Sequence, residues 1–244
     1  MDIHRPNAAV HGWRELLKEI GIIVIGVVIA LGAEQAVEAI HWMYQVDAGE
    51  AALKVAFIRE VDNMALRKTQ SDCIALRLSF LSQIVERASN NGQLPAVGAI
   101  GHPPFTPWTI GAWDALVAND TVSHLPREKM LAYVQIAQRT AVLSGMSDRE
   151  NDQWTILDSM VGSGRRLSDV EAEQLRMTLA QAAESNRLMQ RTSGRLWELV
   201  KETGLVEASE FDSAMQRATH GTPDAVICHP MVVPASTIKG LTHG

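Results

Sequence analysis

An uninterrupted apolar run near the start of the sequence constrains this chain more than any other feature. From Ile20 to Ala33, fourteen consecutive residues carry neither a charge nor a polar side chain. The run is shorter than the about 20 residues that cross a bilayer as a helix. Taken alone it also fits the apolar core of a signal peptide or a buried helix of a folded domain. The flanking residues must therefore decide between these interpretations.

Charged residues are distributed unequally around this run. Arg5, Arg14 and Lys18 precede it, and no Lys or Arg occurs from residue 19 to residue 53. The charges that follow the run directly are acidic. Lys and Arg accumulate on the cytoplasmic side of a membrane span. The asymmetry predicts a span whose N-terminus lies in the cytoplasm.

Aromatic residues bracket the run at the spacing of a bilayer. Trp13 precedes it, and Trp42 and Tyr44 follow it. A helix from Trp13 to Trp42 would rise about 43 Å at 1.5 Å per residue, close to the roughly 40–45 Å of a bilayer with its headgroups. Because Trp and Tyr collect at both membrane interfaces, we expect these three residues to lie there.

These observations define an expected topology. We interpret residues 18–41 as a retained transmembrane helix and residues 1–17 as a cytoplasmic N-terminus. Residues 42–220 would form an extracytoplasmic helical domain, and residues 221–244, which contain three prolines, an irregular tail. The first partner predicted for the chain is the lipid bilayer.

A cleaved signal peptide remains the alternative. The small residues Ala30 and Gly32, on either side of Leu31, resemble a small-x-small cleavage site behind a basic N-terminus and a short apolar segment. In that case the product would be a secreted helical protein. Both interpretations place the domain outside the cytoplasm.

The apolar segment also carries a resemblance to a known family. Residues 13–31 read WRELLKEIGIIVIGVVIAL, with EQ at 34–35. This segment resembles the opening of a family of uncharacterised bacterial single-pass membrane proteins, and the likeness is looser over residues 107–108, 112–114 and 125–127. The resemblance implies a bacterial inner-membrane setting. It implies no activity, since none is known to us for the family.

The remainder of the chain is predicted to be all-α. Apolar residues recur at helical spacing through residues 46–90, which we expect to continue the helix of the span. Further helices are expected after the proline-containing loop 92–108, with Thr109 as a cap, and from Pro126 to about residue 161. The simplest architecture is an antiparallel bundle of about four helices on a transmembrane stalk.

The clearest helical pattern follows a capping box. Ser168 stands three residues before Glu171, a spacing that marks a helix start. Beyond it, residues recur at alternating steps of four and three, which predicts a seam that packs against other helices. The seam is Leu175, Leu179, Ala182, Asn186, Met189, Ser193, Leu196 and Val200. Gly204 is expected to end this helix, and residues 206–218 to form one more.

No motif in the sequence predicts a reaction. The formal net charge of −6 argues against nucleic acid as a partner, because phosphate binding needs a basic face. Glu38 and His41 stand three residues apart, as in di-iron bundles, but no second such pair exists, so we expect no metal and no cofactor. The prediction is a non-enzymatic structural or interaction protein. The alternative is an extracytoplasmic enzyme whose active site forms only in three dimensions.

The cysteines give a prediction about compartment. Cys73 and Cys228 are the two cysteines of the chain and lie 155 positions apart. An oxidising compartment permits them to pair. We expect a disulfide that ties the tail to the domain, with two unpaired thiols as the alternative.

Small residues follow one face of the predicted span. At 100° per residue, Gly26, Ala30 and Ala33 fall on one stripe. Such a stripe lets two helix backbones approach closely. We therefore predict self-association of the chain through this helix, giving a homo-oligomer.

Polar residues form a second face beside that stripe. Glu34, Glu38 and His41 follow the apolar run at helical spacing, and Glu34 would lie at the outer edge of the hydrocarbon. A carboxylate near lipid is costly unless it is paired, protonated or turned towards another helix. Self-association would turn Glu34 towards the interior of the assembly. Alternatively, Glu34 simply reaches headgroup water and the alanines are good helix formers.

Overall fold

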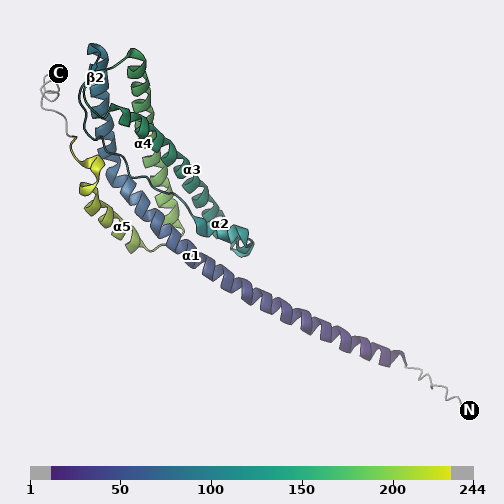
Figure 1. The fold of residues 1–244 in the computed structure, drawn as a ribbon. Helices are drawn as coiled ribbons and strands as arrows, with labels where there is room; N and C mark the ends of the chain where they lie inside the picture. The colour runs from purple at the N-terminus through teal and green to yellow at the C-terminus, as the bar shows by residue number, and fades with distance from the viewer. Residues whose placement is uncertain (1–11, 232–244) are drawn as a thin grey trace, which may run out of the picture. The chain divides into compact units, whose positions relative to one another are not determined.

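A computed structural model describes residues 12–231 of the chain. It is built almost entirely from helices, and its first helix, α1, runs from Trp13 to Asn91 without interruption (Figure 1). The chain divides into two units at Ala48 and Gly49. We call residues 13–48 the N-terminal segment and residues 49–231 the helical domain.

The apolar run lies within the N-terminal segment and is exposed along its length. This part of α1 is long and apolar enough to cross a membrane, and none of its most apolar stretch is buried against the protein. Ile22 is 71% exposed and Val28 61% exposed. The run is therefore not buried as a core helix within the described part of this chain.

The helical domain contains the second half of α1 and four further α-helices within the described residues. These are α2 (Gly111–Ala118), α3 (Arg127–Leu157), α4 (Asp169–Glu202) and α5 (Ala208–Gly221). Short 3-10 turns span Thr121–His124, Asp158–Met160, Thr222–Asp224 and Val226–Cys228. Helices α3 and α4 lie side by side over much of their length (Figure 1). The predicted all-α class is confirmed.

Helix α4 follows the sequence pattern most closely. The Oγ of Ser168 accepts a hydrogen bond from the backbone N–H of Glu171, as a capping box requires. Every residue of the predicted seam is buried. The steps of four and three thus identified the packed face correctly, including its polar members Asn186 and Ser193.

The hydrophobic core draws on three long helices. One buried cluster combines α1, α3, α4 and the segment after α5. Its members include Ile74, Leu78, Leu81, Trp154, Leu157, Leu175, Leu179 and Ile227. Burying an aliphatic or aromatic side chain of this size contributes roughly 1.5–3 kcal/mol, so these contacts hold the ends of the helices together.

Two features of the domain differ from the sequence prediction. The loop 92–108 contains a two-residue strand, β1 (Gln93–Leu94), which pairs antiparallel with β2 (Arg165–Arg166). Strands this short carry no readable period, so hydropathy could not predict them. Helix α2 is preceded by Ile110 at its N-cap and not by Thr109, because Thr109 instead bonds to α1.

The C-terminal region is more ordered than expected within the described residues. Helix α5 continues to Gly221, and two 3-10 turns follow up to Cys228. The rest of the predicted irregular tail, residues 232–244, lies outside the described residues, as does Arg5 of the predicted cytoplasmic end.

Candidate functional site

The aromatic residues expected at the membrane surface all lie on α1. Trp13 is its first residue and is 71% exposed, and Tyr44 is 72% exposed. Trp42 donates its indole N–H to Oε1 of Glu38 over 3.4 Å. The helix thus presents amphipathic rings on both sides of the apolar run, which is the arrangement of interfacial residues in membrane spans.

The polar residues after the run share one side of α1. Glu34, Glu38 and His41 are all exposed in the single chain. The ring of His41 lies 5.5 Å from that of Trp42 in an edge-on arrangement. Glu38, His41 and Trp42 therefore form one local polar-aromatic group, whereas the expected inward position of Glu34 in an assembly stays a prediction.

The small residues of the run are open to a neighbour. Gly26, Ala30 and Ala33 are exposed, and a Cβ atom placed on Gly26 would meet nothing within 4 Å. The stripe is available for a second helix in the single chain. Self-association through it stays a prediction.

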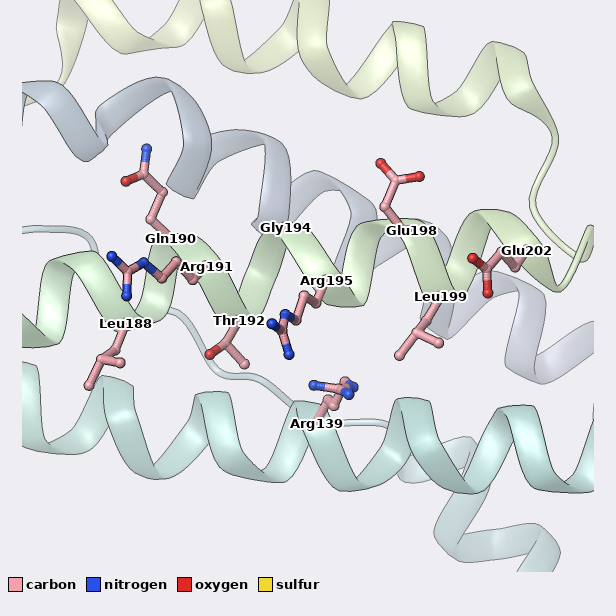
Figure 2. Close-up of a pocket in the computed structure, with 10 residues that line it drawn as sticks. All are labelled: Arg139, Leu188, Gln190, Arg191, Thr192, Gly194, Arg195, Glu198, Leu199 and Glu202. Carbon is pink, nitrogen blue, oxygen red and sulfur yellow. The ribbon is translucent and has the colours of Figure 1, made fainter.

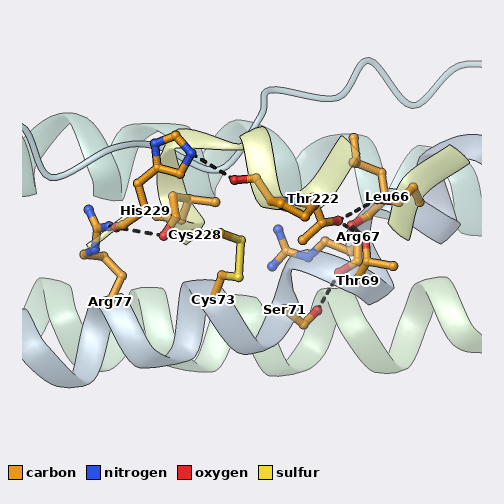
Figure 3. Close-up of a disulfide and its surroundings, with 12 residues drawn as sticks. Leu66, Arg67, Thr69, Ser71, Cys73, Arg77, Thr222, Cys228 and His229 are labelled. Carbon is orange, nitrogen blue, oxygen red and sulfur yellow. Dashed lines mark hydrogen bonds between the residues drawn. A yellow bond between two sulfur atoms is a disulfide. The ribbon is translucent and has the colours of Figure 1, made fainter. Parts of the chain in front are cut away.

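A disulfide fastens the end of the described chain to α1. Cys73 and Cys228 are bonded, with their Cα atoms 4.9 Å apart (Figure 3). One turn before Cys73, the Oγ1 of Thr69 accepts a hydrogen bond from the Oγ1–H of Thr222 over 2.8 Å. The segment after α5 is thus joined to α1 at two successive turns.

Arg77 adds a third fastening one turn further on. Its guanidinium donates to the backbone carbonyls of Ile100, Ile227 and His229. Arg77 and His229 are labelled in Figure 3. The residue is 6% exposed, and burial lowers the pKa of its guanidinium from the ordinary value. The three carbonyls take the place of the water molecules that the cation loses on burial. We call this set of contacts from α1 to residues 222–229 the C-terminal clasp.

A buried ion pair lies at the centre of the helical domain. Arg67 of α1 donates to both carboxylate oxygens of Glu150 of α3, at 2.6 and 2.8 Å. It also donates to Oδ1 of Asn186 of α4 over 2.7 Å. Asn186 in turn donates its Nδ2–H to the backbone carbonyl of Ser71. The network joins three helices, and its members are at most 8% exposed.

A second buried carboxylate holds the proline-containing loop. Glu60 of α1 is 0% exposed and accepts hydrogen bonds from Nδ2 of Asn63 and the backbone N–H of Thr109. Burial raises the pKa of Glu60, and the hydrogen bonds and nearby Arg59 oppose this only in part. Arg59 donates to the carbonyl of Thr109 over 2.6 Å. Adjacent residues of α1 therefore bind both the backbone N–H and the backbone carbonyl of one loop residue, Thr109.

The cluster most like a catalytic site contains a histidine and an aspartate. Nε2 of His102 lies 2.6 Å from Oδ2 of Asp158, and both side chains are partly exposed. Ser147 lines the same small cavity, but its hydroxyl donates to the carbonyl of Thr106 over 3.3 Å. The cavity measures about 10 Å³, which is the space of one water. It therefore has no room for a substrate.

The largest groove among the described pockets lies between α3 and α4. It measures about 680 Å³ and is lined by two leucines, three arginines, two glutamates and small polar residues. Figure 2 shows the side chains of Arg139 of α3 and Arg195 of α4 reaching into the same space between the helices. Thr192 points into that space as well (Figure 2). We call this feature the arginine groove.

Sequence reasoning missed these internal networks and the groove. Arg67, Glu150, Arg77 and Arg139 belong to different helices or pair with backbone, so no spacing along the chain links them. Asn186 alone gave a signal, because a polar residue within an apolar seam needs a partner from another helix.

Comparisons with protein-family models, with curated proteins and with solved structures find no match to this chain. The resemblance of its apolar segment to a family of bacterial membrane proteins therefore stays a prediction.

Proposed function

We propose that the chain is a single-pass membrane protein that displays its helical domain outside the cytoplasm of a bacterium. The observation that carries the proposal is the fully exposed apolar run of α1. Fourteen residues without a polar side chain, uncovered in the chain, form a large apolar surface. Exposure of such a surface to water is unfavourable. A bilayer covers such a surface, and a helix satisfies its own backbone there.

The orientation is supported by charge and by redox chemistry together. Arg14 and Lys18 precede the run, as expected of a cytoplasmic end. The disulfide between Cys73 and Cys228 lies in the domain on the other side. Structural disulfides persist in oxidising compartments and are rare in the cytosol. Both features favour an inner-membrane protein with an extracytoplasmic domain.

Within that setting, we propose that the domain binds a partner and catalyses no reaction. The buried charges Arg67 and Glu150 pair with each other, and the cavity beside His102 has room for one water at most. The accessible features of the described residues include the arginine groove, a second groove of about 500 Å³ beside Leu78 and Arg187, and scattered apolar side chains such as Phe105 and Leu76. These are features of a binding surface.

The anchor is tested by a double substitution in the apolar run and a single control substitution elsewhere on the same helix. In one variant, Val24→Arg and Val28→Arg place two charges in the apolar run, and each costs about 2.5–3.5 kcal/mol of membrane insertion. The control places one arginine at Val55, an exposed valine of α1 in the helical domain, 70% exposed. We expect wild type and Val55→Arg to resist alkaline carbonate extraction, and the double variant to be released.

Topology and processing are read in the same cells. Protease added to intact spheroplasts should degrade the domain and spare a short N-terminal fragment. A soluble product beginning near Ala33 would establish the signal-peptide alternative instead. Protection of the domain from protease would overturn the orientation.

A further inference from the structure

The arginine groove contains three arginines whose charges are not paired within the described residues. Within the described part of the chain, Arg139, Arg191 and Arg195 take part in no ion pair and no side-chain hydrogen bond. Other arginines of α4 behave differently. Arg187 pairs with Glu184 at 2.8 Å, and Arg176 pairs with Glu173 at 3.1 Å.

The two convergent arginines face each other from different helices. Arg139 is half-buried on α3, and Arg195 reaches towards it from α4 (Figure 2). Two guanidiniums that share a space repel each other, and water screens part of this repulsion because Arg195 is exposed. The chain carries a net charge of −6, yet the residues that line the groove place no carboxylate between these two groups (Figure 2).

The acidic residues of the groove do not fill this space. Glu198 points away from α3, and Glu202 lies beyond Leu199 at the end of α4 (Figure 2). Neither forms an ion pair within the described residues. The centre of the groove therefore contains the guanidinium groups of Arg139 and Arg195 and the hydroxyl of Thr192.

The remaining walls suit an organic ligand that carries an anionic group. Leu188, Thr192, Arg195 and Leu199 recur at steps of four, three and four, so they share one face of α4. Leu188 and Leu199 thus flank the polar centre along the helix on both sides. A volume of about 680 Å³ holds a phosphate with a small organic substituent.

We propose that the arginine groove binds a phosphate group between Arg139 and Arg195. The planar fork of a guanidinium matches phosphate oxygens in pairs, and each charge-assisted hydrogen bond is about twice as strong as a neutral one. A phosphate has enough oxygens to accept from both forks and from the hydroxyl of Thr192. Its negative charge also removes the repulsion between the two arginines.

The phosphate has two chemical sources that share this recognition. One is a soluble phosphate compound, and the other is the headgroup of an anionic phospholipid. The proposal concerns the groove itself and holds whether or not α1 spans a membrane. Failure of the membrane proposal therefore leaves it standing.

The test uses the full-length protein in a neutral detergent. Thermal unfolding is followed while sodium phosphate replaces sodium chloride at constant ionic strength. We expect a saturable rise in the melting temperature for wild type. Arg139→Gln and Arg195→Gln should each weaken phosphate binding at least tenfold, and Thr192→Val less.

Matched controls separate a site from general charge attraction. Arg187→Gln removes an equal charge from the same helix, but from a pair with Glu184, and it should bind phosphate like wild type. Without phosphate and at low salt, Arg195→Gln should melt at the same temperature as wild type or higher, because a repulsion is lost. That measurement also shows that the variant folds.

The two sources are distinguished by adding glycerol phosphate or a short-chain phosphatidylglycerol in mixed micelles. A rise with either compound that depends on Arg139 and Arg195 supports the site and names its source. The proposal is overturned if neither compound nor phosphate stabilises wild type beyond chloride. It is equally overturned if the Arg139→Gln/Arg195→Gln double variant binds as well as wild type.

Discussion

The two halves of helix α1 differ in which side chains they bury. In the N-terminal segment the apolar residues are exposed all round, and the apolar run contains no polar side chain. In the helical domain the same helix buries Leu53, Val61 and Leu81, and it buries Arg67 and Arg77 as well. Because the backbone is one continuous helix, the difference in burial comes from the surroundings of each half.

The two halves of α1 differ in the surroundings that they give to charged side chains. In the domain a charged group is buried only where partners from other segments meet it, as Glu150 meets Arg67. The apolar run is not covered by any described segment of the chain, and it contains no charges. The helical domain is therefore tested by removing the partner of a buried charge. The N-terminal segment is tested by replacing its small residues with larger ones.

The largest effect is expected from leaving Arg67 without its partner. Glu150→Leu should lower the free energy of unfolding by about 3–5 kcal/mol, because an uncompensated cation stays buried. Replacing both residues, by Arg67→Met and Glu150→Leu, should cost far less than this single change. Urea unfolding of the detergent-solubilised chain, followed by the fluorescence of buried Trp108 and Trp154, measures both.

The matched control is Arg217→Met, which breaks the exposed pair of Arg217 with Asp62. Exposed pairs contribute about 0–1 kcal/mol, so this variant should unfold close to wild type. Equal losses in the buried and exposed variants would contradict the role of the Arg67 network.

The next effect concerns the C-terminal clasp. Cys228→Ser should lower the free energy of unfolding by about 3 kcal/mol, within the range of 2–5 for loss of a native disulfide. The chain-entropy model places a loop of this length at the upper end, but Arg77 and Thr222 still hold the segment in the reduced protein. Alkylation of both cysteines in unreduced protein would show that the disulfide does not form.

Sequence alone predicted the parts of this molecule that repeat. The helical class, the continuity of α1 and the packed face of α4 follow from spacing, and Ser168 followed from local capping chemistry. The strands β1 and β2 and the Thr109 contact did not, since they depend on segments that meet only after folding.

The same limit applies to the candidate site. The pairing of Arg67 with Glu150 spans 83 positions, and the arginine groove combines α3 with α4. Neither the ion pair nor the groove produces a pattern in the local sequence. The two cysteines were the exception, because a chain with two candidates has one possible internal pairing.

A smaller effect is expected in the pH dependence of the domain. Burial raises the pKa of Glu60 above its ordinary value of 4.5, so the folded protein keeps a proton that the unfolded chain has lost. Stability must therefore fall as pH rises from 4.5 through the raised pKa, and stay lower above it. Glu60→Gln should abolish this fall and retain an acceptor for the N–H of Thr109.

The measurement is the difference in unfolding free energy between wild type and variant from pH 4 to pH 8. Glu86→Gln, an exposed position on the same helix, is the control and should give a flat difference. A flat difference for Glu60→Gln too would show that Glu60 ionises as freely as a solvated carboxylate.

The smallest and most specific effect lies in the N-terminal segment, where the apolar run is exposed. If copies associate through the small stripe, Gly26→Ile and Ala30→Ile should each reduce the signal of a transmembrane dimerisation assay several-fold, because larger side chains separate the backbones. Gly21→Ile is the matched control: it is the same substitution, one and a half turns away on the opposite face, and a Cβ there also meets nothing within 4 Å. Loss in the first two variants with retention in the third would bring Glu34 into an interface and complete the contrast with the domain, where Glu150 already has its partner. Equal signals in all three would leave Glu34 in headgroup water, and the N-terminal segment would then be an anchor and nothing more.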